Sequence, residues 1–370
     1  MNILILNSIG KKKWGGGESW MVLIARELQQ RGHTIRIGCR RNSIIKQNAE
    51  TNQLPVIAFD IYTDFSILGI AQLIKAINTN NIDVIIACQN RDVRVAGFAR
   101  MLTCKKTPLI IARQGIKRIH NSWKYRFTFT RLCDSIVTNT ASLKEEFDSY
   151  GWWDPNHVQV IHNGAEIVNA DAEPLDIRQL IDCNKDSKPI IVSTTCRLAK
   201  QKNLELLIDA ASEIIKQDNR YYFLIAGKGR ERKALQQRIN MLRIGHRVKL
   251  VGFVPDVNQL LKASDIFVLP SAYEGMSNSI IEAMLANLPV VCSAVNGANE
   301  LINDGENGLL FHPSDTQVLI SHLLMLSNPS ERQRLGNQAH NTIVTQFSST
   351  LMGQSYERYI EELLAKKQQK

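Results

Sequence analysis

The sequence alternates short, continuously apolar runs with longer segments of helical periodicity, and this alternation constrains the fold more than any other feature. Apolar runs in the first part of the chain cover residues 3–7, 34–38, 56–60, 84–87, 109–112, 136–139 and 159–162. Helical spacing occurs between them, for example at residues 19–31, 67–78, 93–102 and 142–150. Strands that are apolar throughout are buried on both faces, so the pattern predicts a parallel sheet covered by helices.

The pattern breaks near residue 165 and then starts again. Residues 166–188 are polar and rich in acids, which indicates a linker. The later apolar runs cover residues 190–193, 223–226, 248–251, 266–269, 290–292 and 309–311. Helices are expected at residues 204–217, 231–242, 257–263, 279–286, 299–303, 315–326 and 330–346, with a last one at about 350–366. The chain is therefore predicted to be an α/β protein with two doubly wound, Rossmann-like domains that face each other across a cleft.

Composition agrees with two domains of ordinary size. The chain has 370 residues, of which 44% are hydrophobic and 22% charged, as in soluble globular proteins. It has no apolar run long enough to span a bilayer, and the N-terminus resembles a strand and not a signal peptide. The scattered cysteines form no Cys-x-x-Cys pair and no zinc-like cluster, which favours a reducing, cytoplasmic compartment without structural zinc.

The positive charge is concentrated in the first part of the chain. Residues 1–165 contain 22 Lys and Arg against 12 Asp and Glu, whereas residues 166–370 contain 23 of each kind. Segment 93–133 has many basic residues, no acid, and the interleaved aromatics Trp123, Tyr125, Phe127 and Phe129. This composition suits an anionic membrane surface or an anionic acceptor. A solvated basic face with aromatics packed into the core explains it equally well, so both interpretations stay open.

Two cations follow the first strand of the second domain. Arg197 and Lys202 come after residues 190–193 and precede a helix. Arginine offers a planar fork to phosphate oxygens, and lysine offers a mobile point charge. At the carboxyl edge of a parallel sheet, the pair is well placed to neutralise a diphosphate.

Two carboxylates follow another strand of the same domain. Glu274 and Glu282 bracket Gly275-Met276-Ser277-Asn278, where a loop leads into a helix that begins near Ser277 or Asn278. Backbone N–H groups and the helix dipole favour an anion at such a position. Flanking carboxylates accept hydrogen bonds from hydroxyls, so the pattern suits a ligand that carries both phosphates and hydroxyls, such as a nucleotide sugar.

Glycines mark three other strand–helix connections. Gly15, Gly16 and Gly17 lie between the first strand and the first helix, where a backbone could approach a ligand closely. Gly227-Lys228-Gly229 is a weak phosphate signal, because no P-loop pattern surrounds it. Gly252-Phe253 could pair with a base edge or form an ordinary loop. A dinucleotide site is disfavoured, because the Gly-x-Gly-x-x-Gly pattern is absent.

Together these motifs resemble the donor-binding motifs of the family 4 retaining glycosyltransferases, which have the GT-B fold. The resemblance covers nearly the whole chain and is strongest over residues 190–312. It implies an acceptor-binding domain at residues 1–165, a linker at 166–188, a donor-binding domain at 189–346, and a helix in residues 347–370 that crosses back to the first domain.

The resemblance also implies roles for individual residues. Arg197 and Lys202 would hold the donor diphosphate, Glu282 the ribose hydroxyls, and Glu274 the transferred sugar. The remaining donor contacts it implies are Gly16, Gly17, Gly252, Phe253, Gly275, Met276, Ser277 and Asn278. In the front-face mechanism inferred for retaining members, the leaving diphosphate takes the acceptor proton. Arg197, Lys202 and Glu274 would then form the catalytic set, without a metal or cofactor.

One position departs from the family pattern. Many members carry His-Gly after the fifth strand, whereas this chain has Arg113-Gln114-Gly115. Neither Arg113 nor Gln114 can act as a general base at neutral pH. His120 lies nearby in sequence but does not match the family position. These three residues are the acceptor-side candidates.

The sequence therefore predicts a cytoplasmic or peripherally membrane-bound retaining glycosyltransferase. Its donor would be a UDP- or GDP-linked sugar, and its acceptor a glycolipid or a cell-envelope polysaccharide or lipopolysaccharide precursor. Segment 93–133 would contact the membrane, and no nucleic-acid partner is expected. Two alternatives are a sugar-nucleotide epimerase or hydrolase on the same fold, and an anion-binding module with a dead catalytic site.

Overall fold

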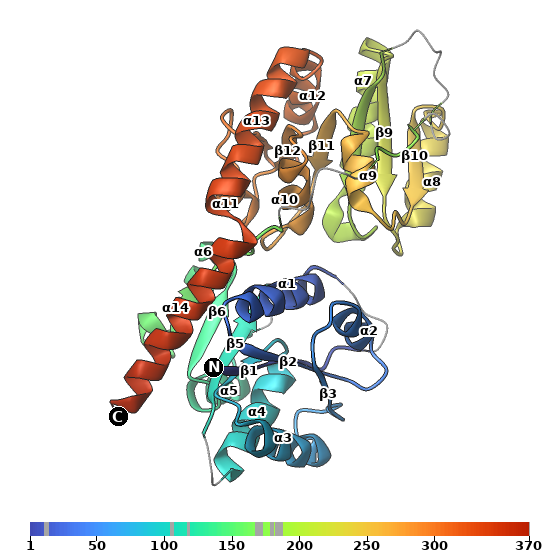
Figure 1. Cartoon of the computed structure of the whole chain (residues 1–370). Coiled ribbons are helices and arrows are strands. Elements are labelled where there is room, and N and C mark those ends of the chain that lie inside the picture. Colours follow the sequence, from blue (N-terminus) through green and yellow to red (C-terminus); the bar gives the residue numbers. More distant parts are fainter. Residues whose placement is uncertain are drawn as a thin grey trace. The chain divides into compact units, whose positions relative to one another are not determined.

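The computed structural model describes residues 1–10, 15–103, 107–116, 119–166, 173–177, 181 and 188–369. Its contacts divide the chain into two compact units (Figure 1). Unit 1 comprises Met1–Glu166 and Ser348–Lys370, and unit 2 comprises Ile167–Phe347. Most of the predicted linker, 166–188, lies outside the described residues. The same holds for four basic residues of segment 93–133, namely Lys105, Lys106, Lys117 and Arg118.

Unit 1 contains a seven-stranded sheet in the order β3-β2-β1-β4-β5-β6-β7, in which every pairing is parallel. The strands are β1 Asn2–Asn7, β2 Thr34–Cys39, β3 Val56–Ala58, β4 Val84–Ala87, β5 Leu109–Gln114, β6 Ser135–Thr138 and β7 Val158–Val160. The helices are α1 Gly16–Gln30, α2 Ile44–Thr51, α3 Ile67–Asn80, α4 Asn90–Leu102, α5 Trp123–Arg131, α6 Ala141–Asp148 and α14 Ser349–Gln368, with a 3₁₀ turn at Pro155–His157.

Both faces of this sheet are buried, as the continuous apolar runs require. Alternate side chains of β1 point to opposite faces: Ile3 and Ile5 pack with α1, α2 and α14, whereas Leu4 and Leu6 pack with the layer of α3 to α6. The C-terminal helix α14 lies against α1, and its Tyr359 hydroxyl lies 2.5 Å from Ser135 Oγ of β6. The end of the chain is therefore part of unit 1.

Unit 2 contains a six-stranded parallel sheet in the order β10-β9-β8-β11-β12-β13. The strands are β8 Ile190–Thr195, β9 Tyr221–Ala226, β10 Val248–Gly252, β11 Ile266–Leu269, β12 Val290–Ser293 and β13 Leu309–Phe311. The helices are α7 Leu204–Gln217, α8 Arg232–Met241, α9 Val257–Lys262, α10 Asn278–Leu285, α11 Ala298–Leu301, α12 Thr316–Met325 and α13 Pro329–Gln346, with a 3₁₀ turn η3 at Lys200–Lys202. Its main core lies between the sheet and α7, α8 and α12.

The predicted fold class, two doubly wound Rossmann-like domains, is confirmed. Two local expectations about candidate site residues were wrong. Helix α1 begins at Gly16, so Gly16 and Gly17 lie in its first turn, and Gly15 is its extended N-cap. Strand β5 continues to Gln114, because Arg113 and Gln114 still pair with Val137 and Thr138 of β6. Both are strand residues at the carboxyl edge and not loop residues.

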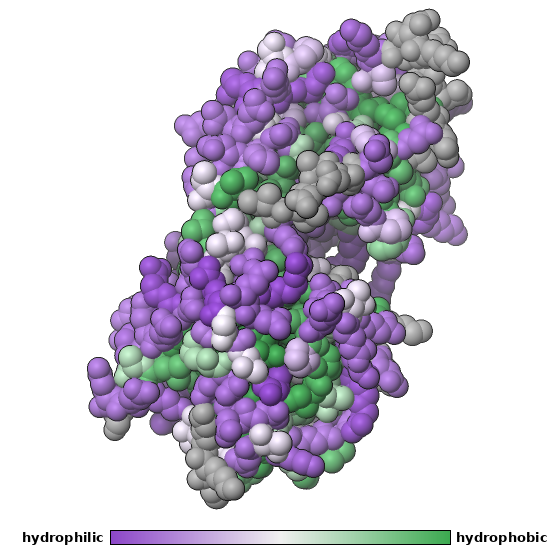
Figure 2. Space-filling model, in the orientation of Figure 1, coloured by the Kyte–Doolittle hydropathy of each residue, from purple (hydrophilic) through white to green (hydrophobic). Residues whose placement is uncertain are grey.

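The surfaces of both units are mixed in polarity. The face in Figure 2 is mostly hydrophilic, with local apolar areas on each unit. Among the described residues, no helix has the length and apolarity needed to cross a membrane. The exposed apolar side chains of unit 1 include Trp123, which is 83% exposed, and Phe127, which is 45% exposed. These two lie on α5, within the basic segment.

Candidate functional site

A partly buried ion pair joins two predicted site residues at the carboxyl edge of the unit 2 sheet. Strands β8 and β11 are neighbours, with Val192 opposite Ile266. Lys202 lies in η3 beyond β8, and Glu274 lies in the loop beyond β11. The Lys202 ammonium pairs with the Glu274 carboxylate, and the two side chains are 13% and 10% exposed. The fold thus brings together a cation and a carboxylate that are 72 residues apart.

The loop that carries Glu274 is fixed by several hydrogen bonds. Ser271 Oγ donates to Glu274 Oε1 at 2.6 Å, and Ser293 Oγ donates to the Ser271 carbonyl at 2.5 Å. The Ala272 N–H donates to the Gln201 carbonyl at 2.8 Å, and Gln201 Nε2 donates to the Tyr273 carbonyl at 2.9 Å. Residues 271–274 are therefore held by the connection that follows β8 and by the last residue of β12.

Helix α10 begins directly after this loop. Its N-cap is Ser277, whose side chain does not cap the helix, and Ser279 Oγ donates to the Thr195 carbonyl at 2.7 Å. The hydrogen bond ties the first turn of α10 to the end of β8. Gly297 packs so closely on this segment that a Cβ there would lie 2.4 Å from the Gly275 carbonyl oxygen. The positive end of the helix dipole is thus held beside Glu274 and Lys202.

Glu282 lies about one turn into α10. Burial raises the pKa of its carboxyl from 4.5 to about 7. No charged neighbour contributes to this shift, because desolvation is its only cause. A half-buried carboxylate of this kind gains most from a ligand that donates hydroxyl hydrogens to it.

The structure explains Gly227 and Gly229 by packing. A Cβ at Gly227 would lie 1.8 Å from the Cys196 carbonyl oxygen, and one at Gly229 would lie 1.9 Å from the Leu198 carbonyl oxygen. Gly227 also has φ +140°, which other residues rarely adopt. These glycines let the connection after β9 pack on the backbone after β8, next to Arg197, whose side chain is exposed.

An exposed aromatic ring follows β10. Phe253 is 61% exposed, and Lys228 Nζ lies 4.8 Å from the centre of its ring. The preceding Gly252 has φ +81°, and its carbonyl accepts from the Gly227 N–H at 2.6 Å. The predicted residues Gly252 and Phe253 therefore lie beside the Gly227–Gly229 connection, and the Lys228 ammonium lies over the Phe253 ring.

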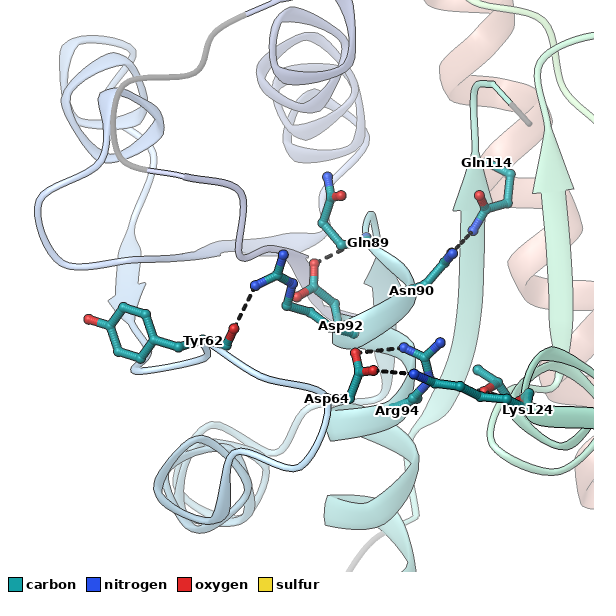
Figure 3. A network of polar contacts seen from close by, with 10 residues as sticks. Tyr62, Asp64, Gln89, Asn90, Asp92, Arg94, Gln114 and Lys124 are labelled. Atoms are coloured by element: carbon teal, nitrogen blue, oxygen red, sulfur yellow. Dashed lines mark hydrogen bonds and ion pairs between the residues drawn. The ribbon is translucent and has the colours of Figure 1, made fainter. Parts of the chain in front are cut away.

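The acceptor-side candidates of unit 1 separate into two groups. Arg113 is 9% exposed, with its guanidinium carbon 4.2 Å from the centre of the Trp20 ring and Nη2 donating to Asn163 Oδ1 at 3.1 Å. Gln114 is 1% exposed, and its Nε2 donates to Asn90 Oδ1 at 3.0 Å (Figure 3). His120 is exposed, with its ring edge-on to Tyr125. The structure gathers Arg113 and Gln114 at the sheet edge and leaves His120 on the surface.

The glycines of α1 lie near Arg113. A Cβ added at Gly17 would be 3.6 Å from Arg113 Nη1, and one at Gly115 would be 2.7 Å from the same atom. The first turn of α1 therefore passes over the guanidinium without side chains in between. In unit 1, Asn90 is a neighbour of the candidate site that the sequence patterns did not identify. Its one signal is that it closely follows a continuously apolar run.

The described residues contain no group of three or more His, Cys, Asp or Glu side chains that could hold a metal ion. The polar residues at the edge of the unit 2 sheet are instead suited to an organic anion. Lys202 and the α10 N-terminus offer positive charge, and Glu274 and Glu282 offer hydrogen-bond acceptors.

Comparisons with known proteins agree with this geometry. The family described as Glycosyltransferase Family 4 matches residues 14–168, and that described as Glycosyl transferases group 1 matches residues 179–342. The lipopolysaccharide core biosynthesis glycosyltransferase LpsE of Rhizobium meliloti (strain 1021) is 29% identical over 62% of this chain and 65% of its own length. The UDP-Gal:alpha-D-GlcNAc-diphosphoundecaprenol alpha-1,3-galactosyltransferase of Escherichia coli is 30% identical over 53% of this chain and 51% of its own. The chain thus spans less than two thirds of the length of these relatives.

Solved structures match the chain over almost its whole length. The crystal structure of Anabaena Alr3699/HepE in complex with UDP has a TM-score of 0.84 at 23% identity and covers 98% of this chain and 100% of that one. A glycosyltransferase from Rickettsia africae ESF-5 has a TM-score of 0.84 at 20% identity, covering 98% of both chains. These matches show the GT-B fold. With family matches in both units, the chain belongs to the group 1 glycosyltransferases of family 4.

Proposed function

We propose that this protein transfers a sugar, with retention of anomeric configuration, from a nucleoside-diphosphate donor to a hydroxyl of a glycolipid or saccharide precursor of the cell envelope. The partly buried Lys202–Glu274 pair at the edge of β8 and β11 carries the proposal. UDP is the first donor nucleotide to test, because the Anabaena structure contains UDP and the Escherichia coli relative is named for UDP-Gal. Both relatives named for an envelope or lipid-linked product support the acceptor class.

In this proposal the donor lies along the edge of the unit 2 sheet. Arg197 and Lys202 hold the diphosphate, and the N–H groups of Gly275 to Asn278 at the α10 N-terminus contact the phosphate and the sugar. Glu282 accepts hydrogen bonds from the ribose hydroxyls, and Glu274 from the transferred sugar. Gly252 and Phe253 contact the base.

The proposed reaction needs no protein nucleophile. The bond between the sugar C1 and the leaving phosphate oxygen breaks while the acceptor oxygen attacks C1 from the same face. The departing diphosphate oxygen takes the acceptor proton, and Arg197 and Lys202 stabilise the charge that develops on the diphosphate. Glu274 positions both the sugar and Lys202, so the protein mainly orients the reactants and stabilises charge.

Donor binding can be tested without knowledge of the acceptor. Thermal unfolding of the whole chain with UDP-, GDP- and ADP-sugars should reveal a nucleotide that raises the midpoint, because a ligand that binds only the native state stabilises it. Lys202→Met should abolish the shift, whereas Lys200→Met should retain it, since Lys200 is exposed on the same turn. Binding that survives Lys202→Met would refute the site assignment.

Product analysis separates the proposal from its alternatives. Proton NMR of the product should show the donor's anomeric configuration at the new linkage. An inverted linkage would exclude the front-face step. Hydrolysis or epimerisation of the donor without an acceptor product would favour the second enzymatic interpretation, and nucleotide binding without turnover would favour a dead module.

The membrane part of the proposal depends on α5. Trp123, Arg126, Phe127 and Arg131, with Thr130 and Trp152, line an open hollow of about 400 Å³. Other cations of the basic segment are paired with carboxylates: Arg94 and Lys124 share Asp64, and Arg100 pairs with Asp134. Outward aromatics beside Arg126 and Arg131 suit the headgroup region of an anionic bilayer.

Liposome flotation tests this contact. The wild-type chain should float with vesicles that contain anionic lipid at physiological salt. Trp123→Ala with Phe127→Ala should reduce the bound fraction several-fold, while nucleotide binding in unit 2 stays unchanged. Met241→Ala, which removes an exposed apolar side chain from unit 2, is the matched control. Equal flotation of both variants would remove the membrane proposal and leave the transferase proposal intact.

A further inference from the structure

The Glu274 carboxylate is held through one of its two oxygens. Oε1 accepts from the Lys202 ammonium and, at 2.6 Å, from Ser271 Oγ. The described residues donate no hydrogen bond to Oε2. Oε2 is not enclosed either, because the buried side-chain oxygens that lack a partner within the described part of the chain do not include it. One oxygen of Glu274 is therefore occupied by the protein, and the other is open to a ligand.

Ser271 is itself fixed by its surroundings. It is 1% exposed and lies two residues beyond the end of β11. Ser293 Oγ, at the end of the neighbouring strand β12, donates to the Ser271 carbonyl at 2.5 Å. On the next residue, the Ala272 N–H donates to the Gln201 carbonyl at 2.8 Å. Because the backbone is tied on both sides and the side chain is buried, the Ser271 hydroxyl stays directed at Glu274 Oε1.

The two donors to Oε1 differ in what else they can bind. The Lys202 ammonium carries three N–H donors on a mobile stem. In the proposed donor complex it also contacts the diphosphate, whose charge competes with Glu274 for it. The Ser271 hydroxyl has a single hydrogen and a buried, fixed position. A hydrogen bond to an ionised carboxylate is stronger than one between neutral groups, so Ser271 retains Glu274 when Lys202 turns toward the phosphates.

Resting on the transferase function proposed above, we propose that Ser271 is a positioning residue for the transferred sugar. Its hydroxyl holds Glu274 Oε1, so that Oε2 stays directed at the sugar hydroxyls while Lys202 is engaged with the diphosphate. Ser271 contacts neither the sugar nor the phosphates. It acts through Glu274, and it contributes to the orientation of the donor on which the reaction depends.

This role distinguishes two parts of the donor. Loss of the Ser271 hydroxyl leaves Arg197, Lys202 and the α10 N-terminus in place, so the affinity for a nucleoside diphosphate should not change. The affinity for the corresponding sugar nucleotide should fall, because the sugar is the part that contacts Glu274. A merely structural serine would behave differently, since its loss would disturb the loop and weaken the binding of both ligands together.

Isothermal titration calorimetry on the full chain tests this distinction. The ligands are UDP with UDP-glucose, UDP-galactose and UDP-N-acetylglucosamine, GDP with GDP-mannose, and ADP with ADP-glucose. For the nucleotide that binds, Ser271→Ala should keep the diphosphate affinity within about two-fold and weaken the tightest sugar nucleotide by about three- to ten-fold. Ser264→Ala is the matched control, because Ser264 lies two residues before β11 and its Oγ donates to the Leu260 carbonyl at 2.7 Å. The control should change neither affinity.

A double-mutant cycle shows whether Ser271 acts through Glu274. Glu274→Ala removes the carboxylate, so Ser271→Ala in that background should cost no further affinity for the sugar nucleotide. Additive losses would show that Ser271 acts by another route. The cycle uses the same pair of ligands, and the diphosphate affinity of each variant reports that unit 2 remains folded.

Three outcomes would overturn the inference: an equal loss of affinity for the diphosphate and its sugar nucleotide in Ser271→Ala, no loss for either ligand, or additive losses in the cycle. The wild-type titrations separate this inference from the proposed function. If no diphosphate or sugar nucleotide binds the wild type, the proposed function itself fails. If both ligands bind and one of the three outcomes follows, only the role of Ser271 is lost.

Discussion

Replacing Glu282 with glutamine should stabilise the free protein at alkaline pH and weaken nucleotide binding at the same time. Burial raises the pKa of Glu282 from 4.5 to about 7. Such a rise corresponds to about 3 kcal/mol of unfavourable free energy for the ionised form in the folded state. Glutamine keeps the size and polarity of the side chain but carries no charge. We expect Glu282→Gln to raise the free energy of unfolding by about 1–3 kcal/mol at pH 8.

The pH dependence has a definite sign. The carboxyl ionises near pH 4.5 in the unfolded chain but near 7 in the folded one, so the native state binds more protons between these values. The stability contributed by this group is present below about pH 4.5 and is lost as the pH rises to 7. The advantage of Glu282→Gln should accordingly be small at pH 5 and reach its full size above pH 7.

The two units offer separate spectroscopic signals for this measurement. All five tryptophans lie between residues 14 and 153, so tryptophan fluorescence follows unit 1. Urea unfolding followed by far-UV circular dichroism also detects unit 2. Glu282→Gln should shift the circular dichroism transition at pH 8 and leave the fluorescence transition in place. Glu306→Gln, an exposed residue of unit 2, should shift neither.

Binding should change in the opposite direction. Glu282→Gln replaces one carboxylate oxygen with an NH2 group, which cannot accept from a ribose hydroxyl, and removes the charge, so nucleotide binding should weaken by about 1.5–3 kcal/mol, or ten- to a hundred-fold. Binding to the wild type below pH 7 should release a proton, because the bound hydroxyls favour the ionised carboxylate. Calorimetry in buffers of different ionisation enthalpy measures that proton. Equal stability gains at pH 5 and pH 8, or no proton release, would refute the reasoning.

Three further substitutions test other parts of the structure. Lys202→Met removes the partner of Glu274 and should reduce the transition-state stabilisation, measured from kcat/KM, by about 2–4 kcal/mol. A decrease in kcat/KM of less than three-fold would contradict the proposed role of Lys202. Gly229→Ala places a Cβ 1.9 Å from the Leu198 carbonyl oxygen and should cost about 2–4 kcal/mol of unit 2 stability in urea unfolding; Gly245→Ala, whose Cβ meets only Ile239 at 3.7 Å, is the control and should cost less than about 1 kcal/mol. Asp92→Asn should remove the decline in unit 1 stability that we expect from about pH 4 to pH 7, because burial raises the pKa of Asp92 from 3.8 to about 7; a tryptophan-fluorescence transition that still weakens over this interval would contradict it.

The succession of secondary-structure elements could be predicted because it depends on local periodicity. A strand buried on both faces must be apolar at every position, and a helix on a sheet must be apolar on one side. Helix α7, Leu204–Gln217, and strands β4, β11 and β13 have the predicted bounds. The errors fall at element ends. Gly16 and Gly17 are helical, and Arg113 and Gln114 remain in a strand, because pairing partners distant in sequence decide where an element stops.

The candidate site, too, could be predicted from the sequence only in part. The sequence by itself determined the parallel α/β order, and with it that Lys202 and Glu274 both follow strands at one edge of a sheet. Only the tertiary structure decided that they form a partly buried pair, that Gly227 and Gly229 serve packing, and that Ser271 donates to the same Glu274 oxygen as Lys202. Periodicity reports which face of an element is buried, since burial acts on each residue locally. Pairing and desolvation depend on which residues meet across strands, and the sequence pattern does not contain that information.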